Sequence, residues 1–165
     1  MFRPNANERP AARTGRWLVV LALGAAWLAG CGNPQVNQPD PLEVVHMPLD
    51  GAVDVEPDVA VRIYFSDAVD AGSLQAGTVW LESAAWDGSV CGESWTNTEW
   101  AAAVEQDQPN VIRIGTEAES LEPDTCYRVL CTTGLQGVNS GPLPALGHPE
   151  LPADVAAVAR FRTRS

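Results

Sequence analysis

Apolar and polar side chains alternate with a period of two in several short stretches of the chain. In the stretch 59–66, Val61, Ile63 and Phe65 fall on one face of an extended chain, and Arg62 falls on the other. Because successive side chains of a β-strand point to opposite faces, this alternation predicts strands that are buried on one side. The alternating stretches are 59–66, 79–81, 111–114, 127–131 and 157–163.

Turn-forming residues separate these stretches, and no segment shows an apolar stripe with the 3.6-residue period of a helix. Asp50-Gly51, Asp87-Gly88 and Pro123-Asp124 are such turn pairs, and a Gly- and Pro-rich stretch covers 134–152. Short strands divided by turns at this spacing are typical of an all-β fold. The pattern predicts one antiparallel β-sandwich domain over residues 42–165, a length sufficient to bury a core.

The first thirty residues have the three-part pattern of a secretory signal peptide. Four arginines and one acid in residues 1–16 precede a thirteen-residue apolar run, 17–29, and then Gly30. This run is shorter than the roughly 20 residues that a membrane-spanning helix requires. We therefore expect residues 1–30 to be removed on export rather than to remain as a transmembrane helix.

The residues at the expected cleavage site, Leu28-Ala29-Gly30-Cys31, resemble the lipobox of bacterial lipoproteins. The resemblance implies cleavage before Cys31 and its acylation, with palmitate among the chains, so that Cys31 attaches the protein to a membrane. The residue after Cys31 is Gly32 and not Asp. By resemblance to the sorting rules of bacteria with two membranes, this implies transfer to the outer membrane. Residues 31–41 are polar and rich in Pro and Asn, which predicts a short disordered tether.

The exported part of the chain is strongly acidic. Residues 1–30 hold four of the ten basic and one of the 21 acidic residues, which leaves six Arg against twenty acids, a net charge of −14. Phosphate backbones repel such a chain, so we expect no nucleic-acid partner. Export also places the remaining cysteines, Cys91, Cys126 and Cys131, in an oxidising compartment, where disulfides persist.

Three blocks of the predicted domain resemble the S-layer-type bacterial Ig-like domain, in the family's order. The blocks are Pro48-Leu49-Asp50-Gly51-Ala52-Val53-Asp54-Val55 with the following 61–70, then 121–129, then Phe161-Arg162-Thr163. The resemblance implies an Ig-like β-sandwich in which Tyr127 forms a tyrosine corner, its hydroxyl bonded to backbone upstream. The segments 84–108 and 134–155 do not match the family, which favours them as the place of any special role.

The three cysteines of the domain leave one thiol without a partner. Cys126 and Cys131 lie on one predicted strand, about 16 Å apart, whereas a disulfide requires Cα atoms within about 7 Å. Cys91 is therefore the shared candidate. In the Ig-like topology the end of the strand near 78–84 lies beside the start of the strand near 126–132. This favours Cys91–Cys126 over Cys91–Cys131 without excluding the second pairing.

No combination of residues predicts catalysis or a cofactor. A catalytic thiol needs a base such as His46 or His148 beside it, and no G-x-S-x-G nucleophile elbow is present. His46 and Met47 are possible copper donors before an opening similar to that of small periplasmic copper carriers, but the sequence supplies no further ligands. Calcium would need several carboxylates in one loop, and turn formation explains the same residues. These carboxylates are Asp50, Asp54, Asp58, Asp67 and Asp70.

Three tryptophans, Trp86, Trp95 and Trp100, lie in or beside the divergent segment among Asp, Gly, Ser and Thr. Aromatic side chains gathered in a loop can form a stacking platform for a glycan or a protein. They can equally cover the domain's own apolar surface, and the sequence leaves both interpretations open. Trp80 belongs to an alternating stretch and is a candidate for the core.

From these features we expect a non-catalytic lipoprotein of the cell envelope, attached to the outer membrane through Cys31. Its Ig-like domain would serve adhesion, envelope structure or the binding of an envelope protein or glycan. The alternative is a binding protein for a divalent cation or a glycan, including a role similar to that of a periplasmic copper carrier. Fold alone does not choose between these functions.

Changing Cys31→Ala is expected to remove the acylated residue and with it the membrane attachment. Each buried CH₂ of an acyl chain contributes about 0.8 kcal/mol, so the parent should enter a detergent-rich phase and the variant the aqueous phase. Detergent phase partitioning, with the mass of the N-terminal peptide, measures this. Equal partitioning of the two proteins after signal cleavage contradicts the lipoprotein assignment.

Overall fold

The computed structural model describes residues 38–115 and 118–165. The expected signal peptide, the lipidation site Cys31 and most of the expected tether lie outside the described residues, so the anchor remains a prediction. Gln38–Ser165 form one compact unit. Within it Asp40 accepts a hydrogen bond from the amide of Gly141, and Pro41 forms a bridge with the same residue. The last residues of the expected tether are thus paired with the domain.

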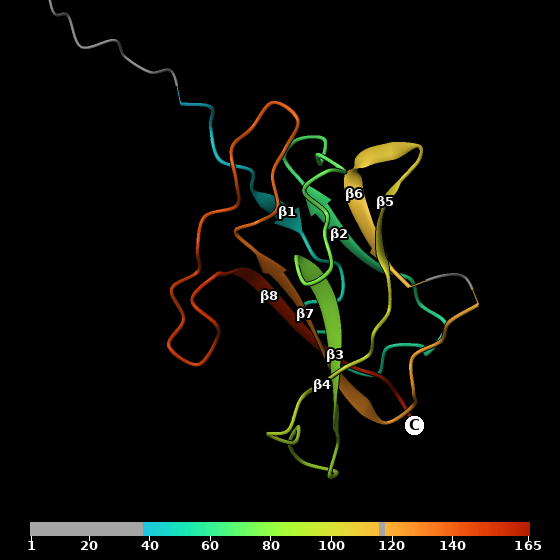
Figure 1. Ribbon diagram of the computed structural model, residues 1–165. Coiled ribbons are helices and arrows are strands. Elements are labelled where there is room, and N and C mark those ends of the chain that lie inside the picture. The colour runs from blue at the N-terminus through green and yellow to red at the C-terminus, as the bar shows by residue number, and fades with distance from the viewer. Residues whose placement is uncertain (1–37, 116–117) are drawn as a thin grey trace, which may run out of the picture. The chain divides into compact units, whose positions relative to one another are not determined.

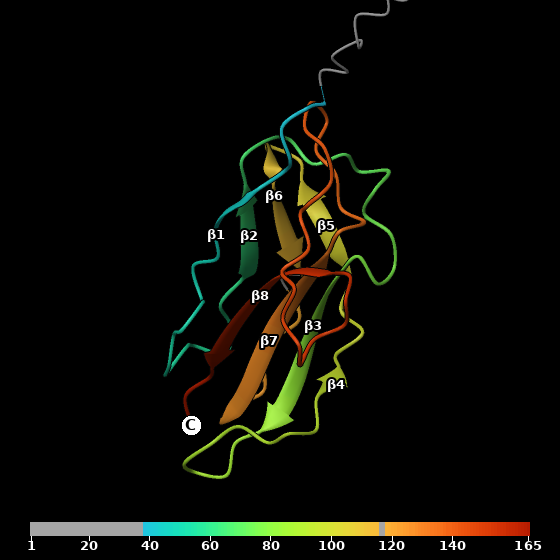
Figure 2. The ribbon, with the colours of Figure 1, turned by 90° about the vertical axis from the view of Figure 1, so that its left-hand side faces the viewer.

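Eight strands form two antiparallel four-stranded sheets, and no helix occurs among the described residues (Figure 1). The first sheet holds, in order, β1 (Val44–His46), β2 (Val61–Phe65), β6 (Gln108–Ile114) and β5 (Ala102–Glu105). The second holds β4 (Thr96–Asn97), β3 (Val79–Ala85), β7 (Thr125–Thr132) and β8 (Val155–Arg162). In Figure 2 the strands of each sheet can be followed from left to right, β1-β2-β6-β5 in the first sheet and β8-β7-β3-β4 in the second. The predicted all-β sandwich is confirmed.

The core lies between the two sheets and follows the alternation in the sequence. In β2, Val61, Ile63 and Phe65 are buried, whereas Arg62 and Tyr64 are partly exposed. The alternating stretches fall in β2, β3, β6, β7 and β8, as predicted. The described residues contain no helix long and apolar enough to cross a bilayer.

Strand β7 is buried on both faces, unlike the other strands. Tyr127, Val129 and Cys131 point inward and belong to the main core, together with residues of both sheets. Leu130 points outward and packs in a second cluster with Leu151. The burial of both faces means that additional chain must cover the outer side of the second sheet.

The segment 51–55 runs along the open edge of β8. The amide of Gly51 donates to the carbonyl of Arg160, and the amide of Arg162 donates to the carbonyl of Ala52. Val55 continues this pairing as a parallel bridge to Thr163. The turn that starts the segment needs Gly51 at a φ of 74°, a conformation in which residues with a side chain are strained. The turn motif of the first block therefore fixes this segment beside β8.

Tyr127 makes the hydrogen bond that the sequence predicted. Its hydroxyl accepts a 2.7 Å hydrogen bond from the backbone amide of Glu122, in the connection that crosses from β6 to β7. The ring stacks on Phe161 of β8 with 5.4 Å between centroids. Burial raises the pKa of Tyr127 above its ordinary value, so the hydroxyl stays neutral at physiological pH. The Tyr127 hydroxyl thus helps to tie the crossover between the sheets to the core, together with buried Leu121.

Changing Tyr127→Phe is expected to lower the free energy of unfolding by about 1–3 kcal/mol, because the ring stays in place and the amide of Glu122 loses its acceptor. Urea unfolding followed by tryptophan fluorescence measures the change. Tyr64→Phe is the matched control, since the Tyr64 hydroxyl makes no hydrogen bond to the described residues. If both variants lose the same stability, the crossover does not depend on the Tyr127 hydroxyl.

Candidate functional site

The outer face of the second sheet carries two rows of side chains that alternate with the core residues. Strand pairing places Glu82, Arg128 and Arg160 in one row across β3, β7 and β8. The next row holds Ala84 and Cys126, with Arg162 beside them. Three of the six arginines that follow residue 30 therefore gather on one small patch of an acidic domain.

A disulfide fastens a loop over this patch. We call residues 86–95, which follow β3, the tryptophan loop. Cys91 in this loop is bonded to Cys126 of β7, with 5.8 Å between their Cα atoms. Cys126 lies opposite Ala84, so the end of β3 is beside the start of β7. The favoured pairing is confirmed, and for the topological reason given from the sequence.

Cys131 is not a partner in any disulfide, and the alternative Cys91–Cys131 pairing is wrong. Cys131 points into the core on the opposite face of β7 from Cys126 and is fully buried. Burial raises the pKa of the Cys131 thiol to about 12, which keeps it protonated. Cys131 therefore acts as a small apolar core residue.

The start of the tryptophan loop is a tight turn held by Asp87. Its Oδ1 accepts hydrogen bonds from the backbone amides of Val90 and Ser89, each at 2.8 Å, and from the Ser89 hydroxyl. These hydrogen bonds, that of Val90 first, hold the pKa of Asp87 below its ordinary value. Gly88 takes a φ of 96° in the same turn. Trp86 and Cys91 face each other across it as an antiparallel bridge.

Two of the three tryptophans stack on arginines of the patch. The guanidinium of Arg162 lies 4.4 Å from the centroid of Trp86, and that of Arg128 lies 4.5 Å from the centroid of Trp95. Both arginines are also paired with carboxylates, Arg128 with Glu82 on β3 and Arg162 with Asp54 at 2.9 Å. A cation held over an indole face in this way is attractive, and here it fixes the position of each ring.

Trp86 and Trp95 line a hollow of about 230 Å³ that opens to solvent. Its wall also includes the disulfide at Cys91, the segment 51–53 beside β8, and Arg160 with Arg162. Val53 on the rim is 65% exposed. The lining is mostly carbon, with cationic groups at one side. We call it the Trp86–Trp95 hollow.

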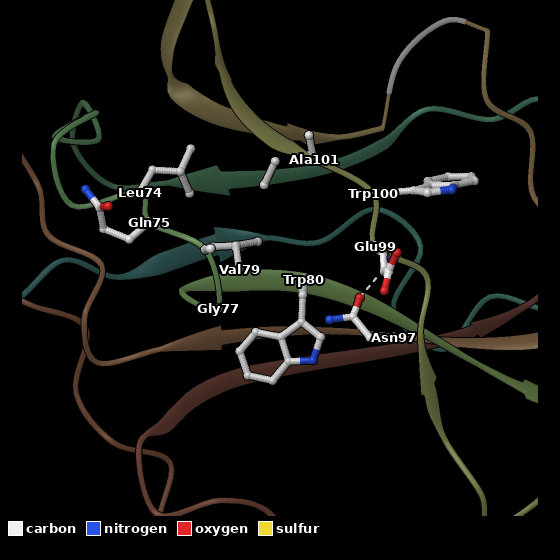
Figure 3. A pocket seen from close by; sticks show the side chains of 11 residues that line it. Leu74, Gln75, Gly77, Val79, Trp80, Asn97, Glu99, Trp100 and Ala101 are labelled. Carbon is white, nitrogen blue, oxygen red and sulfur yellow. Dashed lines mark hydrogen bonds between the residues drawn. The ribbon is translucent and has the colours of Figure 1, made fainter.

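Trp100 lies elsewhere. It follows β4 and packs against the main core, and the space beside Gly115 is filled by its ring. Trp100 and Trp80 line a separate cavity of about 320 Å³, in which their indole rings point in different directions (Figure 3). The Trp80 indole donates a 2.9 Å hydrogen bond to Glu82, and its ring packs on the second cluster with Leu130. Of the three tryptophans considered for a platform, Trp86 and Trp95 line one hollow, whereas Trp100 packs against the core.

The residues considered for metal binding do not gather into a site among the described residues, where no group of three or more His, Cys, Asp or Glu is placed to hold an ion. His46 is exposed at the end of β1 beside Tyr64, and His148 accepts a hydrogen bond from the amide of Glu150. Asp67 accepts amide hydrogen bonds from Asn139 and Ala68, which lower its pKa. Carboxylates engaged in this way stabilise loops. Asp50, Asp54 and Asp70 are likewise bonded to backbone or to arginine.

The sequence shows the arginines of the hollow but does not mark them as part of a site. Arg160 and Arg162 occupy the polar positions of an alternating strand, a pattern that also describes an ordinary solvated face. They become part of a candidate site only because β7 places Arg128 beside them and the disulfide holds two indole rings over the patch. Neither contact can be deduced from spacing along the chain.

The comparisons with known proteins assign neither a family nor a function to this chain. No protein-family model matches the chain, and a search of curated proteins finds no similar sequence. Among solved structures, the chain is similar to the N-terminal part of the bacterial S-layer protein SbsC, with 11% identity and a TM-score of 0.42. The match covers 89% of this chain and 27% of the other, so the chain spans about a quarter of that structure.

Changing Cys91→Ser is expected to lower the free energy of unfolding by about 3–4 kcal/mol, because the disulfide closes a loop with a sequence separation of 35. Cys91 is exposed, so the serine itself costs little. Urea unfolding with and without reductant measures the change. Reductant should lower the free energy of unfolding of the parent by the same amount as the substitution does, and it should leave that of the variant unchanged. A Cys91–Cys131 peptide in a non-reducing digest would overturn the assignment.

Proposed function

We propose that this chain is a lipid-anchored protein of the cell envelope whose β-sandwich is a non-catalytic module that binds another envelope component through the Trp86–Trp95 hollow. The signal peptide and lipobox at Cys31 support export and attachment to the outer membrane. The S-layer-type blocks in the sequence support an Ig-like assignment within the β-sandwich class. Tyr127, in the second block, has the hydrogen bond of a tyrosine corner, which further supports it.

One observation carries the proposal: two partly exposed tryptophans line an open, mostly apolar hollow. Each ring rests on an arginine, and the loop that carries both rings is fastened to β7 by a disulfide. Rigid aromatic side chains are the residues that most often dominate binding energy at interfaces, because little conformational entropy is lost when a partner binds.

The cysteines support a non-catalytic role. Cys91 and Cys126 are joined in the disulfide, and the raised pKa of buried Cys131 removes the thiolate that nucleophilic catalysis requires. His46 lies at the end of β1, in the first sheet, whereas Cys131 points into the core from β7. The described part of the chain therefore offers no activated thiol for the cysteine chemistry considered from the sequence.

A test uses the full-length protein in detergent micelles, so that its acyl chains are occupied, mixed with detergent-extracted envelope fragments that retain wall and surface polysaccharides. We expect the parent to co-sediment with the fragments. The double variant Trp86→Ala, Trp95→Ala should lose at least tenfold in retained protein, because it loses both ring surfaces of the hollow.

Tyr64→Ala is the matched control, since it removes a half-buried aromatic ring from the first sheet and leaves the hollow intact. Thermal melting must show that both variants are folded. Equal retention of the parent and a folded double variant means that the hollow is not the binding surface, and the proposed function is then wrong.

A further inference from the structure

We propose that the Trp86–Trp95 hollow binds a carboxylate-bearing sugar ring of an envelope polysaccharide, with Arg160 pairing with the carboxylate. The inference rests on the proposed function, and it adds the chemical class of the ligand. It depends on three features of the hollow, which are the state of Arg160, the polar groups of the wall, and the occupied edge of β8.

Arg160 has a cationic group without a partner. Its backbone is fixed on both sides, because its amide donates to Asp50 and its carbonyl accepts from Gly51. Its guanidinium makes no hydrogen bond or ion pair to the described residues. The other arginines of the domain are engaged. The ion pairs are Arg62–Glu105, Arg128–Glu82, Arg162–Asp54 and Arg164–Glu56, and Arg113 has an interaction of its own.

The Arg160 side chain is exposed and lies beside other arginines. Arg160 lies directly opposite Arg128 in the pairing of β7 with β8, and like charges opposite each other destabilise a sheet. The neighbouring carboxylates of Glu82 and Asp54 pair with other arginines. The carboxylate of Asp50 accepts a hydrogen bond from the backbone amide of Arg160 rather than from its guanidinium. One positive charge thus remains at the wall of the hollow, where an anion would be stabilised by a charge-assisted hydrogen bond.

The remaining polar side-chain groups of the wall are hydrogen-bond donors. The indole N–H groups of Trp86 and Trp95 have no acceptor among the described residues. The Nε of Arg162 also lacks a hydrogen-bond partner, but it is buried and so is not among the donors open to a ligand. Tyr127 also borders the hollow, but its hydroxyl is engaged by the amide of Glu122. A wall of donors calls for a ligand rich in acceptor oxygens, and a sugar acid supplies carboxylate, ring and hydroxyl oxygens together.

The shape of the hollow favours a single ring. About 230 Å³ is below the roughly 300–1,000 Å³ of sites for drug-sized ligands. The C–H faces of a pyranose ring can lie on the indoles while its substituents reach the donors. The net charge of −14 on the exported chain repels a densely charged polymer. A polysaccharide with one carboxylate on an otherwise neutral repeat therefore fits better than a heavily charged one.

A peptide fits this place less well than a sugar. Extended peptides gain affinity by adding a strand to a free sheet edge. Here the edge of β8 beside the hollow is already occupied, because Gly51 and Ala52 bond to Arg160 and Arg162. An acidic peptide would have to bind through one side chain alone. The structure thus favours the saccharide, and a peptide becomes an outcome of the test.

The test titrates the full-length protein in detergent with three probes by isothermal calorimetry. The probes are a galacturonate trimer, the same trimer fully methyl-esterified, and a hexapeptide containing one glutamate. The variants are Arg160→Gln and Arg62→Gln, which remove the same charge from the second and the first sheet. We expect the free-acid trimer to bind the parent and Arg62→Gln alike, and Arg160→Gln at least tenfold more weakly. The ester should bind the parent at least tenfold more weakly than the acid and be insensitive to Arg160→Gln.

Each contrary result has a distinct meaning. Equal binding of acid and ester overturns the role of the carboxylate, and tighter binding of the hexapeptide than of the trimer overturns the saccharide. If no probe binds, the inference is wrong. The proposed function still holds in that case if the double variant Trp86→Ala, Trp95→Ala loses retention on envelope fragments. If that variant is retained like the parent, the proposed function fails as well.

Discussion

Strand β7 has apolar residues on both faces, and both must be kept from water. Its inward side is covered by the opposite sheet, but Cys126 and Leu130 on the outward side need a cover that no sheet provides. Two excursions of the chain supply it. The tryptophan loop covers Cys126 through the disulfide, and residues around Leu151 cover Leu130. Burying a large apolar side chain contributes roughly 1.5–3 kcal/mol, so these excursions are part of the stability of the domain. The candidate site is built on the first of them.

The indole rings of the tryptophan loop are supported by arginines, and the positive charge of these arginines and their neighbour Arg160 is only partly neutralised by carboxylates. Arg128 and Arg162 support the indole rings and are neutralised by Glu82 and Asp54. Arg160 lies opposite Arg128, and its guanidinium has no carboxylate partner among the described residues. Natural sequences agree with their folds at most positions and depart from that agreement mainly where function requires it. An unpaired cation facing an apolar hollow in an acidic chain is such a departure.

The sequence predicted what depends on local periodicity and on the order of the strands. Period-two alternation located the strands that face the core, and the strand order implied by the Ig-like resemblance favoured Cys91–Cys126 over Cys91–Cys131. The short strands β1, β4 and β5 were missed, because two to four residues, none of them fully buried, carry too little apolar pattern to be recognised. Trp100 was grouped with the loop tryptophans, since proximity in sequence does not show that its ring fills the space beside Gly115. The role of Arg160 followed only from contacts between strands distant in sequence.

The segment 51–55 covers part of an open sheet edge, which limits how copies of this domain can pair with one another. Open sheet edges invite neighbouring molecules to add strands, and the usual defence is to keep edges short or covered. The edge strands β1, β4 and β5 have three, two and four residues. The eight-residue edge strand β8 is covered at Arg160 and Arg162 by backbone from Gly51 to Val55. Neighbouring copies therefore find little edge to pair with, and the domain can reach high local density without aggregating through its sheets.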